Sequence, residues 1–168
     1  MLKTEYEVKF YLINKNELIK KLLTLNAKLN QKETLMRRFV YSLGPQRWLR
    51  LRDEGNKVTL TIKEEQKKSI EGMKEATLII NNNFDEAHNF LKNLNLSDEK
   101  YEENFRETWI LNDSVITIDR WPNLDPFIEI EGTNAEQVTT VAHTLGFQMK
   151  DALYGTVTDL YKHNHKKQ

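Results

Sequence analysis

The sequence predicts an α+β protein built on an eight-stranded antiparallel β-barrel with flanking helices. Eight short stretches alternate apolar and polar residues, which is typical of strands with one buried face. Turn-forming residues separate several of them at hairpin distance, as in "LGP" at 43–45 and "EGN" at 54–56. Antiparallel hairpins with only a few helices favour a barrel over repeated βαβ units.

The expected strands are bounded by turn residues or by helical stretches, with "ND" and "PNLDP" as the last two turns. They cover residues 4–12, 35–43, 47–53, 57–64, 73–80, 103–111, 114–121 and 126–131.

Three stretches carry the apolar spacing of amphipathic helices, at 14–27, 84–96 and 133–146. The expected N-caps are Asn14 or Asn16, then Asp85, then Thr133 in a capping box with Glu136. Gly146 is expected to end the third helix. The positions expected to face the core are Leu18, Ile19, Leu22, Leu23, Ala87, Phe90, Leu91, Leu94, Val138, Val141, Ala142 and Leu145.

Length and composition indicate one domain, which we place at 1–162 and follow with a polar tail at 163–168 that we expect to be disordered. Because 25 basic and 25 acidic residues cancel, the basic excess of a nonspecific nucleic-acid binder is missing. The chain has no cysteine, no apolar signal region and no run long enough to cross a membrane. We therefore expect a cytoplasmic protein without a nucleic-acid or membrane partner.

Two strands far apart in the chain each present paired carboxylates on one face. "EYEVKF" places Glu5, Glu7 and Lys9 on one side, and "FIEIEG" places Glu129 and Glu131 together. Other strands continue the pattern, with one apolar face and one face carrying charge or hydroxyl groups. The further residues on these faces are Arg50, Arg52, Thr59, Thr61, Lys63, Glu75, Thr77, Asn104, Arg106, Thr108, Thr117 and Asp119.

For any single strand, a charged face in water explains this alternation adequately. Arginine pairs together with carboxylate pairs instead favour a closed barrel lined with both signs of charge. Arginine and lysine suit phosphate oxygens, and carboxylates at two-residue spacing suit Mg²⁺ or Mn²⁺. Since an unpaired buried charge costs several kcal/mol, such a lining points to a polyanion bound together with metal. Of Arg37 and Arg38, one faces inward, and the strand register decides which.

The ordered set of charged residues resembles the CYTH superfamily, the triphosphate tunnel metalloenzymes, over residues 4 to 161. The hallmark ExExK is matched by Glu5, Glu7 and Lys9. The other signatures follow in the same order: Arg50 and Arg52, Lys63, Lys74 with Glu75, Arg106, Asp119, and Glu129 with Glu131. Two positions depart from the family pattern: Thr77 stands where a second acid is frequent, and Asn104 where a lysine is frequent.

The resemblance implies an eight-stranded tunnel in which basic residues hold a triphosphate and carboxylates hold Mg²⁺ or Mn²⁺. The implied metal ligands are Glu5, Glu7, Glu129 and Glu131. The implied phosphate contacts are Lys9, Arg50, Arg52, Lys63, Lys74 and Arg106. The implied catalytic residues are Glu7, Lys9, Glu75 and Asp119, the last two in metal support or in orienting the nucleophile.

Three functions follow from this resemblance. We expect first a metal-dependent hydrolase of inorganic or organic triphosphate. The alternatives are a class IV adenylyl cyclase, which forms cyclic AMP and pyrophosphate from ATP, and a tunnel that binds polyphosphate or nucleotide without turnover. The expected partner is a small triphosphate such as tripolyphosphate or ATP. The sequence leaves open whether the protein forms a homodimer.

Overall fold

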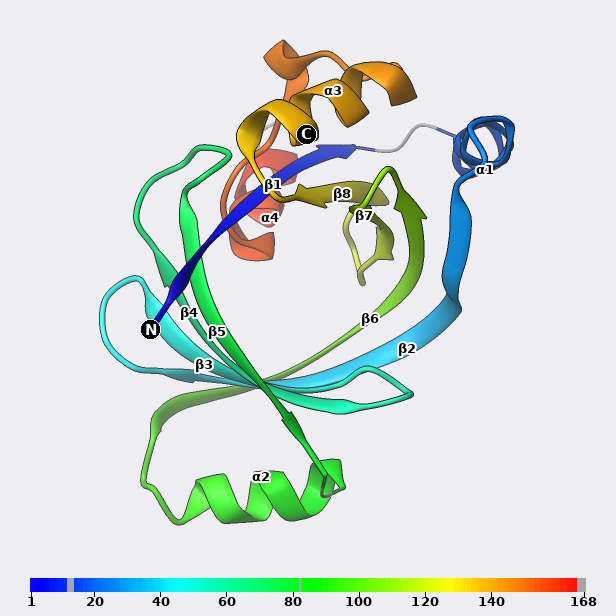
Figure 1. The fold of residues 1–168 in the computed structure, drawn as a ribbon. Coiled ribbons are helices and arrows are strands. Elements are labelled where there is room, and N and C mark those ends of the chain that lie inside the picture. Colours follow the sequence, from blue (N-terminus) through cyan, green and yellow to red (C-terminus); the bar gives the residue numbers. More distant parts are fainter. Residues whose placement is uncertain (12–13, 82, 166–168) are drawn as a thin grey trace.

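A computed structural model of the chain, which describes residues 1–11, 14–81 and 83–165, contains a closed eight-stranded β-barrel with helices packed around it (Figure 1). The strand order around the barrel is β1-β5-β4-β3-β2-β6-β7-β8, and the paired strands run antiparallel. The predicted fold class is confirmed.

The strands follow the predicted order. They are β1 (Lys3–Tyr11), β2 (Lys28–Ser42), β3 (Arg47–Asp53), β4 (Val58–Glu65), β5 (Met73–Ile80), β6 (Ser97–Leu111), β7 (Ser114–Arg120) and β8 (Phe127–Gly132). The helices are α1 (Lys15–Thr24), α2 (Phe84–Lys92), α3 (Ala135–Leu145) and α4 (Val157–His165), with a 3₁₀ turn η1 at Met149–Asp151. Residue 12, the last of the first expected strand, lies outside the described residues.

Strands β2 and β6 begin several residues earlier than predicted, and they pair with each other along most of their length. The register shifts twice between Leu29 and Thr34, where β2 contains irregularities. These shifts interrupt the two-residue alternation in the first half of β2, so the sequence pattern did not reveal that half.

The helix caps differ from the prediction at two of three helices. Asn14 caps α1 as expected, and Gly146 ends α3 with φ of 94°. The cap of α2 is Asn83, whose side chain accepts from the backbone N–H of Glu86, so the expected Asp85 cap is wrong. At α3 the cap is Asn134, and Gln137 reaches back to Thr133, one residue later than the expected box. Asn and Asp are close equivalents as caps, so pattern alone could not separate neighbouring candidates.

The apolar core lies outside the barrel, between the outer faces of the strands and the helices. Helices α1 and α3 cover one side of the wall, and α2 lies far from them against β2 and β3 (Figure 1). The third cluster joins Leu160 of α4 to Trp121, Leu124 and Phe127. The outward apolar faces are thus buried under helices, which leaves the charged faces to line the interior.

Three of the apolar helix positions expected in the core are exposed instead. Leu23 is 57% exposed, Phe90 68% and Leu94 52%. Phe84 and His88 join Ala87 and Leu91 on the buried face of α2, where they contact Phe39 and Tyr41. Leu94 lies beyond the end of the helix.

The C-terminal segment folds against the barrel as helix α4. Residues 163–165, which were expected in a polar tail, form the last turn of this helix, and residues 166–168 lie outside the described residues. Within the described chain, no helix is both long enough and apolar enough to cross a membrane.

Candidate functional site: a charged tunnel

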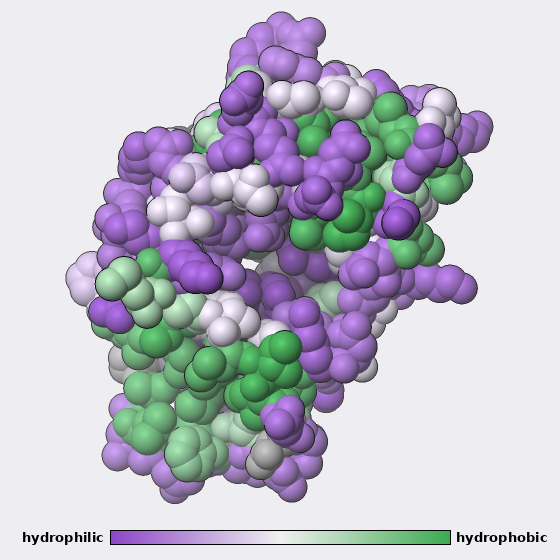
Figure 2. Space-filling view, viewed as in Figure 1, coloured by the Kyte–Doolittle hydropathy of each residue, from purple (hydrophilic) through white to green (hydrophobic). Residues whose placement is uncertain are grey.

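The interior of the barrel is a cavity of about 950 Å³ with a charged lining. Its walls come from every strand except β7, together with residues 155–158 before and at the start of α4. A hollow among hydrophilic residues is visible on the face shown in Figure 2. Alternation within each strand places one side chain in two toward this interior, and these are the charged positions that the sequence singled out.

One wall of the cavity is acidic and is built from three adjacent strands, β5, β1 and β8. It carries Glu75 from β5, Glu5 and Glu7 from β1, and Glu129 and Glu131 from β8. The register sets Glu7 opposite Glu131 and Lys9 opposite Glu129. The two ExE pairs therefore stand side by side on neighbouring strands.

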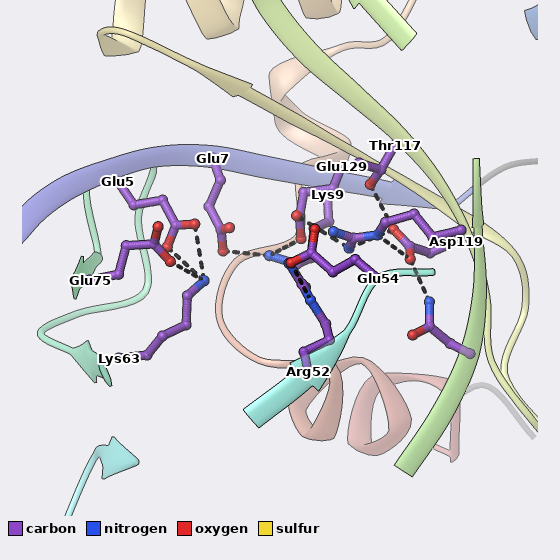
Figure 3. Close-up of polar contacts among 12 residues, drawn as sticks. Glu5, Glu7, Lys9, Arg52, Glu54, Lys63, Glu75, Thr117, Asp119 and Glu129 are labelled. Carbon is purple, nitrogen blue, oxygen red and sulfur yellow. Dashed lines mark hydrogen bonds and ion pairs between the residues drawn. The ribbon is translucent and has the colours of Figure 1, made fainter. Parts of the chain in front are cut away.

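Two lysines partly neutralise the acidic wall (Figure 3). Lys9 Nζ lies 2.5 Å from Glu7 Oε1 and 3.0 Å from Glu129 Oε2. Lys63, from β4, lies 2.7 Å from Glu5 Oε2 and 3.5 Å from Glu75 Oε2. Four of the five carboxylates share these two lysines, and Arg106 Nη2 lies a further 3.5 Å from Glu129 Oε1. Glu131 forms no ion pair within the described chain, so the wall keeps an excess of negative charge.

The excess is reflected in the protonation of the carboxylates. Burial, followed by the charges of Glu5 and Glu129, raises the pKa of Glu131 to about 7. Burial also raises the pKa of Glu7 above its ordinary value. At Glu129 burial acts in the same direction, but Lys9 and Arg106 outweigh it and hold the pKa below its ordinary value.

The acidic wall fits a divalent cation in its chemistry. Oxygen donors from four carboxylates at neighbouring positions are what Mg²⁺ and Mn²⁺ prefer, and the raised pKa of Glu131 marks negative charge that a cation would offset. In the described part of the chain, no three acidic or histidine side chains already converge as a metal group. The carboxylates face Lys9 and Lys63 instead, so convergence requires these lysines to turn away.

The opposite wall is basic and is built from β3, β2 and β6, which are also adjacent. It carries Arg50 and Arg52 from β3, Arg38 from β2 and Arg106 from β6, which outnumber the two carboxylates of β6 in the lining, Glu99 and Glu102. Arg52 is paired with Glu54, and Arg106 with Asp119 by two hydrogen bonds of 2.8 and 2.9 Å. Arg38 and Arg50 have no carboxylate within 4.0 Å among the described residues.

Arg50 shows the imbalance of this wall most clearly. Its Nε is buried without a hydrogen-bond partner in the described structure. Burial, followed by the charge of Arg52, lowers the pKa of Arg50 to about 10. A buried guanidinium in this condition is stabilised by an anion that enters the cavity.

Two predicted site residues do not reach the cavity. Lys74 neighbours Glu75 on β5, and because Glu75 points inward, the alternation turns Lys74 to the other face. Asp119 is fully buried and is not part of the cavity lining. It accepts a hydrogen bond from Thr117 (Figure 3). It also accepts hydrogen bonds from Asn104 and Arg106, so it orients the basic wall from behind.

The other predicted site residues line the cavity together, namely Glu5, Glu7, Lys9, Arg50, Arg52, Lys63, Glu75, Arg106, Glu129 and Glu131. Thr77 also lines it and shares a 2.9 Å hydrogen bond with Thr61.

The sequence did not identify Glu54 and Trp121 as cavity residues. Glu54 lies in the turn after β3, where strand alternation does not predict the direction of a side chain, and it binds Arg52 and Thr59. Trp121 follows the end of β7, and only the closed barrel brings it to the cavity. The open choice between Arg37 and Arg38 is decided for Arg38, since Arg37 pairs with Asp53 and does not line the cavity.

The comparison with known families agrees with this geometry. The CYTH domain family matches residues 3–160, so the chain belongs to the CYTH family. No curated protein sequence matches the chain.

Several solved structures share the fold. A Pyrococcus furiosus conserved hypothetical protein is 22% identical with a TM-score of 0.79, covering 94% of this chain and 99% of its own. A Pyrococcus horikoshii protein is 25% identical with a TM-score of 0.78, covering 93% and 98%. A candidate adenylate cyclase from Vibrio parahaemolyticus is 14% identical with a TM-score of 0.80, covering 96% and 99%. A Hippeastrum candidate adenylyl cyclase described as having a dominant triphosphatase activity is 17% identical with a TM-score of 0.52, covering 90% of each chain.

Proposed function

We propose that this protein is a divalent-metal-dependent enzyme that hydrolyses an inorganic or organic triphosphate inside the tunnel. The observation that carries the proposal is the separation of charge across the cavity. Carboxylates in excess face arginines in excess, and Arg50 is buried on the basic side without an acidic partner. A polyanion bound together with a divalent cation satisfies both walls at once.

In this proposal the basic wall binds and orients the triphosphate. Arg50, Arg52 and Arg106 come from two strands and approach the phosphates with planar guanidinium groups, each of which can donate two parallel hydrogen bonds. Asp119 and Glu54 fix two of these groups in advance, so little ordering is needed when the ligand binds.

The acidic wall holds the metal through Glu5, Glu7, Glu129 and Glu131. When bound, the cation supplies charge neutralisation of the phosphoryl oxygens. Lys9 and Lys63 stand between the walls, and on release from the carboxylates they reach phosphate oxygens. Glu75 is 28% exposed at its side chain, more than the other carboxylates bound to these lysines, and we assign it to orienting the attacking water.

An adenylyl cyclase is the second candidate for the same cavity. The volume of about 950 Å³ is at the upper end of the range for organic ligands, so it has room for a nucleoside beyond the phosphates. Fold relatives include candidate adenylate cyclases, and the one from Hippeastrum is described as mainly a triphosphatase. The third candidate function is binding of polyphosphate or nucleotide in the tunnel without turnover.

Product analysis tests the proposal. The purified protein is incubated with Mg²⁺ or Mn²⁺ and, separately, with tripolyphosphate or ATP, and all products are resolved by chromatography. We expect orthophosphate from tripolyphosphate, lost in both Glu7→Gln and Arg52→Ala. Cyclic AMP with pyrophosphate from ATP would establish the cyclase instead. Tight binding without any product would contradict both activities and leave a binding protein.

A further inference from the structure

Arg38 is a buried cation in the basic wall whose charge no carboxylate balances. Its residue is 5% exposed, and it lines the cavity. The only side-chain hydrogen bond that it makes within the described chain goes to the neutral Oδ1 of Asn104, and its Nε has no partner. Because an unpaired buried ion costs several kcal/mol, this arrangement is a poor one for packing alone.

The position of Arg38 is nevertheless fixed on two sides. Its guanidinium carbon lies 4.5 Å from the centre of the Trp121 ring, in a cation–π contact. On the other side, the Nδ2 of Asn104 donates a 2.7 Å hydrogen bond to Asp119 Oδ1, the atom that also accepts from Arg106 Nε. Asn104 and Asp119 therefore hold Arg38 in a set place relative to Arg106.

Arg38 lies at the centre of the arginine group. Strand β2 runs between β3 and β6, and the register sets Arg38 opposite Arg52 on β3 and opposite Glu102 on β6, with Arg106 four residues further along β6. Burial, followed by the charges of Arg52, Arg50 and Arg106, lowers the pKa of Arg38 well below its ordinary value, and Asp119 opposes this only in part. Repulsion among these groups is relieved when an anion enters between them.

We infer that Arg38 binds a phosphate oxygen of the triphosphate, and that Asn104 positions Arg38 for this contact. The inference rests on the proposed function, since it concerns the same ligand. It adds a residue outside the ordered set of charged residues singled out in the sequence, and it gives the uncharged Asn104 a role in holding a cation supplied by the neighbouring strand. The ligand class is a linear polyphosphate, free or as part of a nucleotide.

Binding measurements on Arg38→Gln test the first part. Tripolyphosphate is titrated calorimetrically in the presence of Mg²⁺, and we expect Kd to rise about tenfold or more, since a charged hydrogen bond is lost. Arg37→Gln is the matched control, because Arg37 is the adjacent residue and pairs with Asp53 away from the cavity; its Kd should equal that of the unmodified protein. Arg38→Lys keeps the charge without the planar group and should fall between the two.

Stability of the unliganded variant separates a binding role from a structural one. Because Arg38→Gln removes an unbalanced buried charge, its unfolding temperature without ligand should not fall. A lower unfolding temperature with unchanged Kd would overturn the inference. Absence of tripolyphosphate binding by the unmodified protein would overturn the proposed function as well, whereas normal binding that Arg38→Gln leaves intact would overturn this inference alone.

A double-mutant cycle tests the role of Asn104. If Asn104 acts through Arg38, Asn104→Ala raises Kd in the unmodified background but has little further effect in Arg38→Gln. Fully additive effects on Kd would show that Asn104 does not act through Arg38, and would overturn its assignment as the positioning residue.

Discussion

Individual residues in the cavity are held in energetically unfavourable states that a ligand can relieve. Glu131 keeps a proton that an ordinary glutamate would lose, because burial and two neighbouring carboxylates oppose its charge. Arg50 and Arg38 each have a buried Nε without a hydrogen-bond partner in the described structure. Binding sites commonly retain such groups at a cost to the stability of the unliganded protein.

If Mg²⁺ binds through Glu131 as proposed, we expect its binding to depend on pH. With its pKa raised from 4.5 to about 7, the group is protonated at pH 6 and ionised at pH 8. Since only the carboxylate binds metal, we expect the Kd for Mg²⁺ to fall about tenfold for each unit by which the pH rises towards this pKa. Above the pKa, the Kd should level off. Calorimetric titrations between pH 5.5 and 8.5 measure this.

The same shift predicts the stability of the metal-free protein. Because the folded state holds the proton of Glu131 more tightly than the unfolded state, protonation of Glu131 stabilises the folded protein. This contribution to the free energy of unfolding is complete below about pH 4.5 and is lost as the pH rises through about 7. Glu131→Gln should reduce the pH dependence of Mg²⁺ binding and that of the stability of the metal-free protein, because its amide does not titrate. An equally steep pH dependence of Mg²⁺ binding in Glu131→Gln would refute the assignment to Glu131.

At the scale of elements, each helix covers one outer face of the barrel and so determines which strand faces are left for the cavity. Helix α2 closes the apolar faces of β2 and β3 through Tyr41, Leu49 and Leu51. Its N-terminus sits directly after β5, whose inner face carries Glu75. Helix α2 therefore supports the outer side of the basic wall, on β2 and β3.

The cap of α2 gives a test of this element. Asn83→Ala removes the side-chain acceptor of the Glu86 backbone N–H and should lower the free energy of unfolding by about 1 kcal/mol. Asp85→Ala is the matched control, since it removes only a first-turn charge and should cost less, about 0.3–1 kcal/mol. Urea denaturation followed by circular dichroism compares the two, and a larger loss in Asp85→Ala would contradict the observed cap.

At the scale of the whole molecule, the barrel gathers carboxylates and arginines on two walls of one cavity, which meet where Arg106 Nη2 lies 3.5 Å from Glu129 Oε1. The carboxylates lie on β5, β1 and β8, and the arginines on β3, β2 and β6. The charges of the chain as a whole cancel, so the field in the tunnel comes from their arrangement rather than from the net charge.

This arrangement predicts that metal and polyphosphate bind cooperatively. Mg²⁺ reduces the negative field that opposes the phosphates, and the phosphates supply further oxygen ligands for the ion. Each should therefore lower the Kd of the other by the same factor, as linkage requires. Thermal unfolding with Mg²⁺, tripolyphosphate and both together should show a combined shift larger than the sum of the separate shifts, after allowance for complexes formed in solution. Additive shifts would show that the two ligands occupy independent sites.

The sequence by itself determined the fold class, most of the strand positions and ten of the charged residues that line the cavity, though not Glu54, Glu99 or Glu102. It could do so because side chains alternate along a strand, so the sequence pattern predicts which charged residues share one face, as with Glu5 and Glu7 or Arg50 and Arg52. The family resemblance had placed Lys74 among the phosphate contacts, whereas the alternation that turns Glu75 inward turns Lys74 to the other face.

Only the tertiary structure decided which charges meet. Strand order brings Glu129 beside Lys9, and closure of the barrel brings Trp121 under Arg38 and Asn104 between Arg38 and Asp119. These contacts join residues that are up to 120 positions apart in the chain, from Lys9 to Glu129. Local patterns fix the side on which a residue lies, whereas its partner depends on pairing and register across the whole barrel, and the balance of charge at each wall follows from those partners.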